Sequence, residues 1–251
     1  MYHFYTDKSD IGDKTITLHG EDVNHIKNVL RMHQGEEIII CDGEGDDYHC
    51  RITSLNPDSI EAEILESGIS EAEMPVKVYL FQGLPKKDKL EMIIQKTVEL
   101  GVYEIVPVMT RRVIVKLDDD KKEAKKLERW QAISESAAKQ SGRGIIPKID
   151  GVMSFKKALE WARDMDMAII PYENADSSAE GIAEARRLIE SFRGKEKVAV
   201  FIGPEGGFDE GEIQLAKESG MEPITLGRRI LRTETAGFTV LAWIGYLTEA
   251  Q

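Results

Sequence analysis

The chain has 251 residues, of which 41% are hydrophobic and 31% charged, and 33 Lys and Arg against 45 Asp and Glu give a formal net charge of −12. This composition supplies enough apolar residues for a large core and excludes a mainly disordered chain. No run of about 18 apolar residues occurs, so we expect no transmembrane helix. The first residues lack the pattern of a secretory signal, and two cysteines, Cys41 and Cys50, exclude a disulfide framework. We therefore expect a cytoplasmic protein.

The charge is distributed unevenly along the chain. Residues 1–72 hold 5 basic and 16 acidic side chains, whereas residues 85–148 hold 15 basic and 10 acidic ones. The overall acidity argues against a nucleic-acid partner, but the locally basic segment weakens that argument. The shift near residue 72 is compatible with a domain boundary.

The first seventy residues predict a small, strand-rich barrel with one helix. Short apolar and β-branched runs are bounded by Gly, Asp, Asn and Pro, and residues 42–45 (DGEG) predict a hairpin turn. Apolar residues recur at helical spacing between Glu21 and Leu30. The predicted strands are residues 15–18, 37–41 and 60–65, and the polar residues 67–76 predict a linker.

Strands and helices alternate after this linker, which predicts an α/β layer with a mostly parallel sheet. A capping-box pattern, Asp209 followed by Glu212, marks the start of one helix. The predicted strands are residues 76–81, 103–109, 167–171, 197–202 and 223–226. The predicted helices cover residues 89–100, 121–141, 155–163, 179–191, a stretch opening at 209, and 234–247.

The most distinctive local feature is residues 203–207 (GPEGG), called the GPEGG loop below, which directly follows an apolar strand. In open α/β sheets, ligands bind outside the carboxyl ends of the strands, and glycines let a ligand approach the backbone. The loop matches neither GxGxxG nor GxxxxGK, and its acid, Glu205, would repel a pyrophosphate. The residues alone leave open a ligand site or a plain turn between a strand and a helix.

A second feature is residues 226–232 (LGRRILR), called the arginine loop below. Three arginines lie within five residues, and arginine is favoured for recognising phosphate or carboxylate. A solvated basic turn is the alternative. The helix that follows is apolar on all sides and carries small residues, which fits burial within its own domain or against a second subunit.

A third feature is the basic segment that starts at Arg111 and Arg112 and continues in lysines at helical spacing to Arg129. One such face can track phosphates, although a solvated mixed-charge helix is the alternative. All five histidines lie in the first fifty residues without the spacing of metal ligands, so we expect no metal site.

In the GPEGG loop, the arginine loop and several further segments, the sequence resembles the RsmE family. Members of this family are 16S ribosomal RNA uridine-N3 methyltransferases of the SPOUT class. Residues 201–208 (FIGPEGGF) and 226–236 (LGRRILRTETA) carry the resemblance most closely. Further matching segments follow the family's order over nearly the whole chain. They are residues 95–102 (QKTVELGV), residues 128–130 (ERW) with Ala137, Gln140, Ser141, Arg143 and Pro147, and residues 25–31 (HIKNVLR) with Gly35.

The resemblance implies a two-domain α/β protein. A PUA-like β-barrel that binds RNA would cover residues 1–70. A SPOUT methyltransferase domain with a parallel sheet and a trefoil knot would cover residues 74–251, and the protein would form a homodimer. The knot and the dimer follow from the resemblance alone, since true knots are too rare to be proposed from periodicity.

The resemblance also implies S-adenosylmethionine as cofactor, held between the GPEGG loop and the arginine loop largely by backbone groups. Glu205 would lie near the positive sulfonium or fix its loop by accepting backbone N–H bonds. The implied cofactor-binding residues are Ile202, Gly203, Pro204, Glu205, Gly206, Gly207, Leu226, Gly227, Ile230, Leu231, Thr235 and Ala236.

The implied reaction is attack on the sulfonium methyl by N3 of a specific uridine in the decoding region of 16S ribosomal RNA. Because N3–H is a weak acid, the uracil must be activated or its anion stabilised. We assign this role first to Arg232, as a fixed cation that orients the uracil or its phosphate. Glu234 would orient Arg232 or remove the proton, and Glu205 is the third candidate catalytic residue.

The small ribosomal subunit is the implied partner, and its RNA would contact several basic residues. For the two on the barrel a structural role is equally open, because the barrel is strongly acidic. We expect charge reversal at Arg111 and Arg112 to weaken RNA binding with little effect on cofactor affinity. The candidate RNA-binding residues are His25, Arg31, Arg111, Arg112, Arg129 and Arg143.

Three alternatives stay open at this point. The first is another SPOUT activity, on a tRNA ribose or a different ribosomal RNA base. The second is an RNA-binding homologue with a decayed cofactor site, which a cofactor titration would reveal. The third is a metabolic nucleotide-dependent enzyme, against which the missing phosphate-binding fingerprints count.

Overall fold

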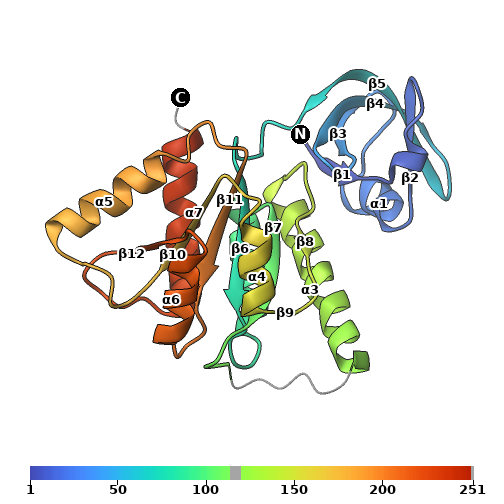
Figure 1. The fold of residues 1–251 in the computed structure, drawn as a ribbon. Coiled ribbons are helices and arrows are strands. Elements are labelled where there is room, and N and C mark those ends of the chain that lie inside the picture. Colours follow the sequence, from blue (N-terminus) through green and yellow to red (C-terminus); the bar gives the residue numbers. More distant parts are fainter. Residues whose placement is uncertain (114–119, 250–251) are drawn as a thin grey trace. The chain divides into compact units, whose positions relative to one another are not determined.

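The computed structural model describes residues 1–113 and 120–249, and the chain divides into two compact units (Figure 1). Unit 1 comprises Met1–Glu73 and Ala138–Ile146, and unit 2 comprises Met74–Ala137 and Pro147–Gln251. Residues 138–146 were expected in the second domain, but they belong to unit 1. Their backbone explains the difference, because Ile146 N–H donates to the carbonyl of Gly43 at 3.0 Å.

Unit 1 is built on a five-stranded sheet in the order β1-β3-β4-β5-β2, in which β1 and β3 are parallel and the other pairs antiparallel. Alternate residues of its strands face one apolar core, as Ile38 and Ile40 do in β3. The elements are β1 (His3–Tyr5), a 3-10 turn η1 (Lys8–Asp10), β2 (Thr15–His19), α1 (Glu21–Asn24), a π-helical turn η2 (His25–Val29), β3 (Glu37–Cys41), β4 (Asp46–Leu55) and β5 (Ser59–Ile69).

Two expectations for this region need correction. The predicted linker at residues 67–76 begins too early, because β5 continues to Ile69 and pairs Tyr48 with Ser67. Backbone hydrogen bonds to β4 extend that strand although its last residues are exposed. The single predicted helix at residues 21–30 is instead a short α-helix followed by the π-helical turn.

Unit 2 contains a parallel sheet in the order β12-β10-β11-β6-β7-β8, with β9 also pairing with β7. Its central strands are apolar on both faces, as parallel strands covered by helices must be. The strands are β6 (Lys77–Gly83), β7 (Glu104–Met109), β8 (Lys148–Ile149), β9 (Met153–Ser154), β10 (Met167–Pro171), β11 (Lys197–Ile202) and β12 (Glu222–Ile224). The helices are α2 (Lys89–Glu99), α3 (Asp120–Ser141), α4 (Phe155–Ala162), α5 (Ala179–Glu190), α6 (Glu210–Glu218) and α7 (Thr233–Glu249).

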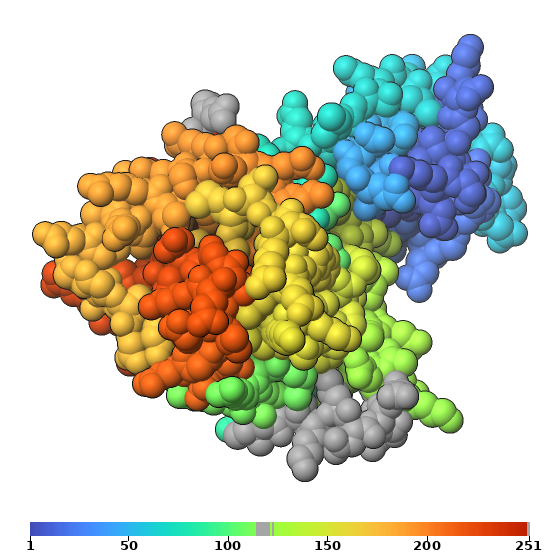
Figure 2. Space-filling view, viewed as in Figure 1, coloured from blue at the N-terminus to red at the C-terminus, as the bar shows by residue number. Residues whose placement is uncertain are grey.

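Helices cover both faces of this sheet. On one face, α4 and α6 pack over a core in which Phe81 and Phe201 stack at 4.4 Å between ring centroids. The side chains of these two helices cover that face in the space-filling view (Figure 2). On the other face, α7 packs against α2, α5 and β11. The parallel sheet and the PUA-like unit confirm the predicted fold class, while the trefoil knot stays a prediction. Within the described residues, no helix is long and apolar enough to cross a membrane.

The amino end of β7 carries a titratable group that makes stability depend on pH. Burial and the neighbouring Asp150 raise the pKa of Glu104 to about 7, against an opposing effect of Lys148. The ordinary pKa of a glutamate is about 4.3, so between roughly pH 4.5 and 7 the folded chain binds more protons than the unfolded one. Stability contributed by this group is therefore present at low pH and is lost as pH rises through that window.

We expect Glu104→Gln to remove most of this loss, because an amide does not ionise. Between pH 5 and pH 8, the unfolding free energy of the wild type should fall by about 1–3 kcal/mol more than that of the variant. Urea denaturation at both pH values measures this. A difference between the two proteins that does not change with pH would contradict the assignment.

Candidate functional site

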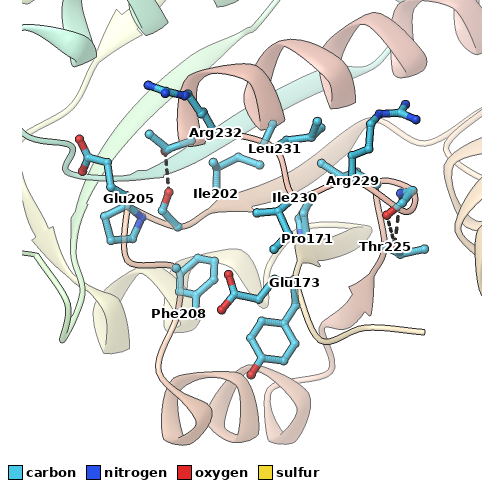
Figure 3. A pocket seen from close by; sticks show the side chains of 18 of the residues that line it. Pro171, Glu173, Ile202, Glu205, Phe208, Thr225, Arg229, Ile230, Leu231 and Arg232 are labelled. Carbon is cyan, nitrogen blue, oxygen red and sulfur yellow. Dashed lines mark hydrogen bonds between the residues drawn. The ribbon is translucent and has the colours of Figure 1, made fainter. Parts of the chain in front are cut away.

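Unit 2 carries an open cavity of about 420 Å³ at the carboxyl ends of three adjacent strands (Figure 3). Its lining is drawn from residues 171–177 after β10, 202–208 after β11 and 225–233 after β12, with Lys89 of α2 and Ala236 of α7. The volume lies within the range of about 300–1,000 Å³ that is common for small-molecule sites. The cavity thus unites the GPEGG loop and the arginine loop, as the sequence predicted.

The GPEGG loop lies very close to the end of β6. A Cβ atom at Gly83 would lie 2.7 Å from both Cδ and N of Pro204, closer than side chains approach one another. Gly207 has φ +67°, a conformation that residues with a side chain rarely adopt. Glycine is therefore required at residue 83 by the close contact with Pro204 and is favoured at residue 207 by its backbone conformation, and the need for it at residue 83 is visible only in the fold.

A buried hydrogen-bond chain ties both loops to the sheet. The hydroxyl of Thr233 donates to the carbonyl of Gly203 at 2.6 Å, and the side-chain amide of Gln82 donates to Thr233 Oγ1 and to the carbonyl of Gly83, both at 2.9 Å. Gln82 is fully buried at the end of β6. Sequence reasoning missed both side chains, although a glutamine that ends an otherwise apolar strand was a usable signal.

Glu205 holds its loop in place. Its carboxylate accepts the backbone N–H of Lys86 at 3.1 and 3.2 Å and lies 3.1 Å from Nζ of Lys89. Partial burial favours a raised pKa for Glu205, but hydrogen bonds from its own backbone N–H, from Lys89 and from Lys86 outweigh burial and hold the pKa below its ordinary value. Of the two roles considered for Glu205, these contacts favour fixing the loop.

Glu234 lies in the first turn of α7, where its carboxylate Oε2 is 3.7 Å from Nζ of Lys89. Its side chain is 12% exposed, and within the described ranges Oε2 is buried without a hydrogen-bond partner. The ion-pair partner of Glu234 is therefore Lys89 and not Arg232, so the expected orientation of Arg232 by Glu234 is not observed. Lys89 was not a candidate from the sequence, because a lysine at the start of an amphipathic helix gives no local signal.

The arginine loop exposes its charged side chains. Arg228, Arg229 and Arg232 are exposed, and Figure 3 shows Arg229 and Arg232 extending away from the cavity. Between them Ile230 is 84% exposed although it lines the cavity. Gly227, with φ +106°, makes the turn at the start of the loop. Cationic side chains thus border the opening, where a polyanionic substrate would approach.

Arg111 and Arg112 lie beside the GPEGG loop. Nη1 of Arg111 donates to Asp209 at 2.7 Å, and Nη1 of Arg112 donates to the carbonyl of Gly206 at 2.7 Å. The expectation that charge reversal at both arginines weakens RNA binding and spares cofactor affinity stays a prediction, and the contact with Gly206 is the place where an effect on the loop would arise.

Of the remaining RNA-binding candidates, Arg129 lies in unit 2, and His25, Arg31 and Arg143 lie in unit 1. Arg129 is exposed and pairs with Glu91 of α2 at 2.7 Å. His25 and Arg31 are exposed at the π-helical turn of unit 1, and Arg31 has φ +55°. Arg143 is only 2% exposed and its guanidinium pairs with Glu73, so its expected contact with RNA is corrected to a structural role in unit 1.

The residues around the cavity suit a ligand that has an apolar ring system and a positive charge. Ile202, Leu226 and Leu231 provide apolar surface, and the glycines expose backbone groups. Glu173, which sequence reasoning also missed, lies against Gly207, and Figure 3 shows its carboxylate between Phe208 and Ile230. The carboxylates of Glu173 and Glu205 offer a place for a positive charge, while Lys89 and the arginine loop line the same cavity.

Comparison with known proteins assigns the chain to a family. Residues 72–245 match the family described as RNA methyltransferase domain, and residues 18–65 match the RNA methyltransferase PUA domain. The ribosomal RNA small subunit methyltransferase E of Bacillus subtilis is 40% identical over 235 residues, which cover 94% of this chain and 91% of the relative. The chain belongs to the ribosomal RNA small subunit methyltransferase E family.

Solved structures of methyltransferases share the fold of this family member. A ribosomal RNA small subunit methyltransferase E from Neisseria gonorrhoeae, bound to S-adenosyl methionine, superposes with a TM-score of 0.81 at 34% identity and 98% coverage of both chains. A methyltransferase from Legionella pneumophila in complex with the same cofactor has a TM-score of 0.77 at 30% identity, covering 97% and 96% of the two chains. The resemblance found in the sequence is confirmed.

Proposed function

We propose that this family member transfers a methyl group from S-adenosylmethionine to ribosomal RNA of the small subunit. The observation that supports this most is the cavity itself, in which the two loops of the family resemblance meet at the carboxyl ends of adjacent strands. A second candidate function, binding RNA without catalysis, is disfavoured because both loops are complete and tied together by Thr233.

The residues present fit the cofactor. Apolar side chains and backbone groups of the two loops would hold its adenine, and the carboxylates of Glu173 and Glu205 would favour its positive charge. When bound, the cofactor supplies an electrophilic methyl group on a sulfonium. The residues that we propose to hold it are Ile202, Gly203, Pro204, Glu205, Gly206, Gly207, Leu226, Gly227, Ile230, Leu231, Thr235 and Ala236.

For the target we propose N3 of a uridine in the decoding region of 16S ribosomal RNA. The role of the chain is to bind the uracil and favour the loss of its N3 proton, which passes to solvent at the cavity opening. Arg232 is exposed at the cavity opening, where its guanidinium is available to stabilise the negative charge that develops on the uracil. Lysines and arginines around the opening would contact phosphates and set the register of the RNA.

Arg232→Ala is therefore expected to slow methyl transfer by about 10²-fold, the size of effect typical when one stabilising donor is lost. The dissociation constant for S-adenosylmethionine should change by less than about twofold, because Arg232 lies at the opening and is not among the residues that we propose to hold the cofactor. Single-turnover kinetics and calorimetry measure the two quantities. Arg186→Ala, at an exposed arginine of α5, is the matched control. An unchanged transfer rate would remove Arg232 from the mechanism.

The reaction is tested with unmethylated small ribosomal subunits, by digesting the RNA after incubation with S-adenosylmethionine and identifying the nucleosides by mass spectrometry. We expect 3-methyluridine. A different methylated nucleoside would assign the chain to another SPOUT activity. Cofactor binding without any methylation would favour the non-catalytic alternative.

We further propose that the protein is a cytoplasmic homodimer. In support, α7 leaves apolar side chains uncovered in the single chain, with Tyr246 76% exposed and Ala242 also exposed one turn away. Light scattering should give about twice the chain mass of 28.2 kDa. A mass equal to one chain would contradict this proposal.

A further inference from the structure

Lys89 is the first residue of α2 and lines the cavity. Its side chain is 32% exposed, and its ammonium lies 3.1 Å from Oε1 of Glu205 and 3.7 Å from Oε2 of Glu234. Glu205 belongs to the GPEGG loop and Glu234 to the first turn of α7, which follows the arginine loop. One cation thus contacts acids on both segments that form the cavity.

The helix gives Lys89 a fixed base. Leu90, Ile93 and Ile94 are buried, so that the first turns of α2 are anchored in the core of unit 2. A side chain on an anchored helix holds a position more precisely than one on a loop. Of the two acids, Glu205 lies on the GPEGG loop and Glu234 in the first turn of α7, directly after the arginine loop.

The two carboxylates depend on Lys89 to different degrees. Glu205 also accepts the backbone N–H of Lys86 with both of its oxygens. Oε2 of Glu234 is buried and has no hydrogen-bond partner in the described part of the chain, so Lys89 is the cation that compensates it. A buried charge that loses its partner is costly, and the surrounding segment moves to expose it to water.

We propose that Lys89 is a positioning residue, which holds the GPEGG loop and the first turn of α7 in their cavity-forming arrangement through Glu205 and Glu234. The hydrogen bond from Thr233 to Gly203 is a second link between the same segments. Loss of the ammonium therefore loosens the cavity and does not unfold the unit. The effect is larger at α7, because Oε2 of Glu234 has no hydrogen-bond donor among residues 1–113 and 120–249.

The inference deepens the proposed function and rests on it for its biological meaning. The exchange experiment uses the full chain without cofactor, so its outcome does not depend on methyl transfer. Hydrogen–deuterium exchange compares the wild type with Lys89→Met and Lys89→Arg. We expect Lys89→Met to speed exchange about tenfold in residues 233–238 and less in residues 203–208, and Lys89→Arg to restore most of the protection. Lys96→Met is the matched control, since Lys96 lies on the same helix and pairs with Glu99 of that helix, at 2.7 Å.

A double variant separates positioning from general stability. In Lys89→Met/Glu234→Gln the amide needs no cation, so exchange in residues 233–238 should return close to the wild-type rate. S-adenosylmethionine affinity, measured by calorimetry, should fall about tenfold in Lys89→Met and recover in Lys89→Arg. Unchanged exchange in Lys89→Met, or equal acceleration in Lys96→Met, would overturn the proposal. Altered exchange without any methyl transfer by the wild type would refute the proposed function and leave this inference standing.

Discussion

Gly83→Ala is expected to weaken S-adenosylmethionine binding by at least about tenfold and to lower the unfolding free energy by about 1–3 kcal/mol, the usual cost of overpacking. The added Cβ would lie 2.7 Å from Cδ and N of Pro204 and 3.1 Å from the carbonyl carbon of Gly203. Main-chain atoms and a proline ring cannot rotate away as the end of a flexible side chain can. The GPEGG loop must therefore move, and the hydrogen bond from Thr233 to Gly203 moves with it.

The control for this prediction is Gly151→Ala. An added Cβ at Gly151 meets nothing within 4 Å, and the residue is exposed in the same unit. Calorimetry gives the cofactor affinity, and urea denaturation gives the stability of each variant. Equal cofactor affinities in the two variants would show that the close contact at Gly83 does not hold the loop.

Glu73→Ala is expected to cost about 3–5 kcal/mol of stability, because it leaves a buried guanidinium without its counter-charge. Arg143 donates to Glu73 from Nε at 2.9 Å, with a second contact from Nη2. The same carboxylate accepts the backbone N–H groups of Gly144 at 3.0 Å and Ile145 at 3.1 Å. The Glu73 carboxylate thus holds residues 143–145 within unit 1, and its loss removes all of these hydrogen bonds together.

Glu190→Ala provides the comparison, since Glu190 pairs with Arg186 on the exposed surface of α5 at 2.8 Å. Exposed pairs of this kind contribute about 0–1 kcal/mol. Denaturation followed by hydrogen exchange in residues 138–146 locates the effect in unit 1. Similar small losses in both variants would mean that the buried pair at Arg143 contributes no more than a surface pair does.

Local sequence patterns predicted most elements of unit 2. The capping box at Asp209 and Glu212 is present with both reciprocal hydrogen bonds, and the strand at Lys197–Ile202 has its predicted bounds. Such features depend on residues close together in the chain. Their hydrogen bonds are local, and their burial follows the repeat of a single helix or strand. The predicted linker at residues 67–76 began too early because the ladder between β4 and β5 depends on a partner strand and not on the polarity of the segment.

The resemblance to a known family indicated that the loops at residues 203–207 and 226–232 would hold the cofactor, whereas their glycines and arginines alone left a plain turn and a solvated basic turn open. The fold then showed which side chains contact those loops and which basic residues are exposed. Lys89 contacts two acids that lie far away in the chain. The buried guanidinium of Arg143 pairs with Glu73 and is not available to RNA. Ion pairs and close contacts depend on which segments become neighbours in the folded chain. The periodicity within a single segment does not indicate which segments these are.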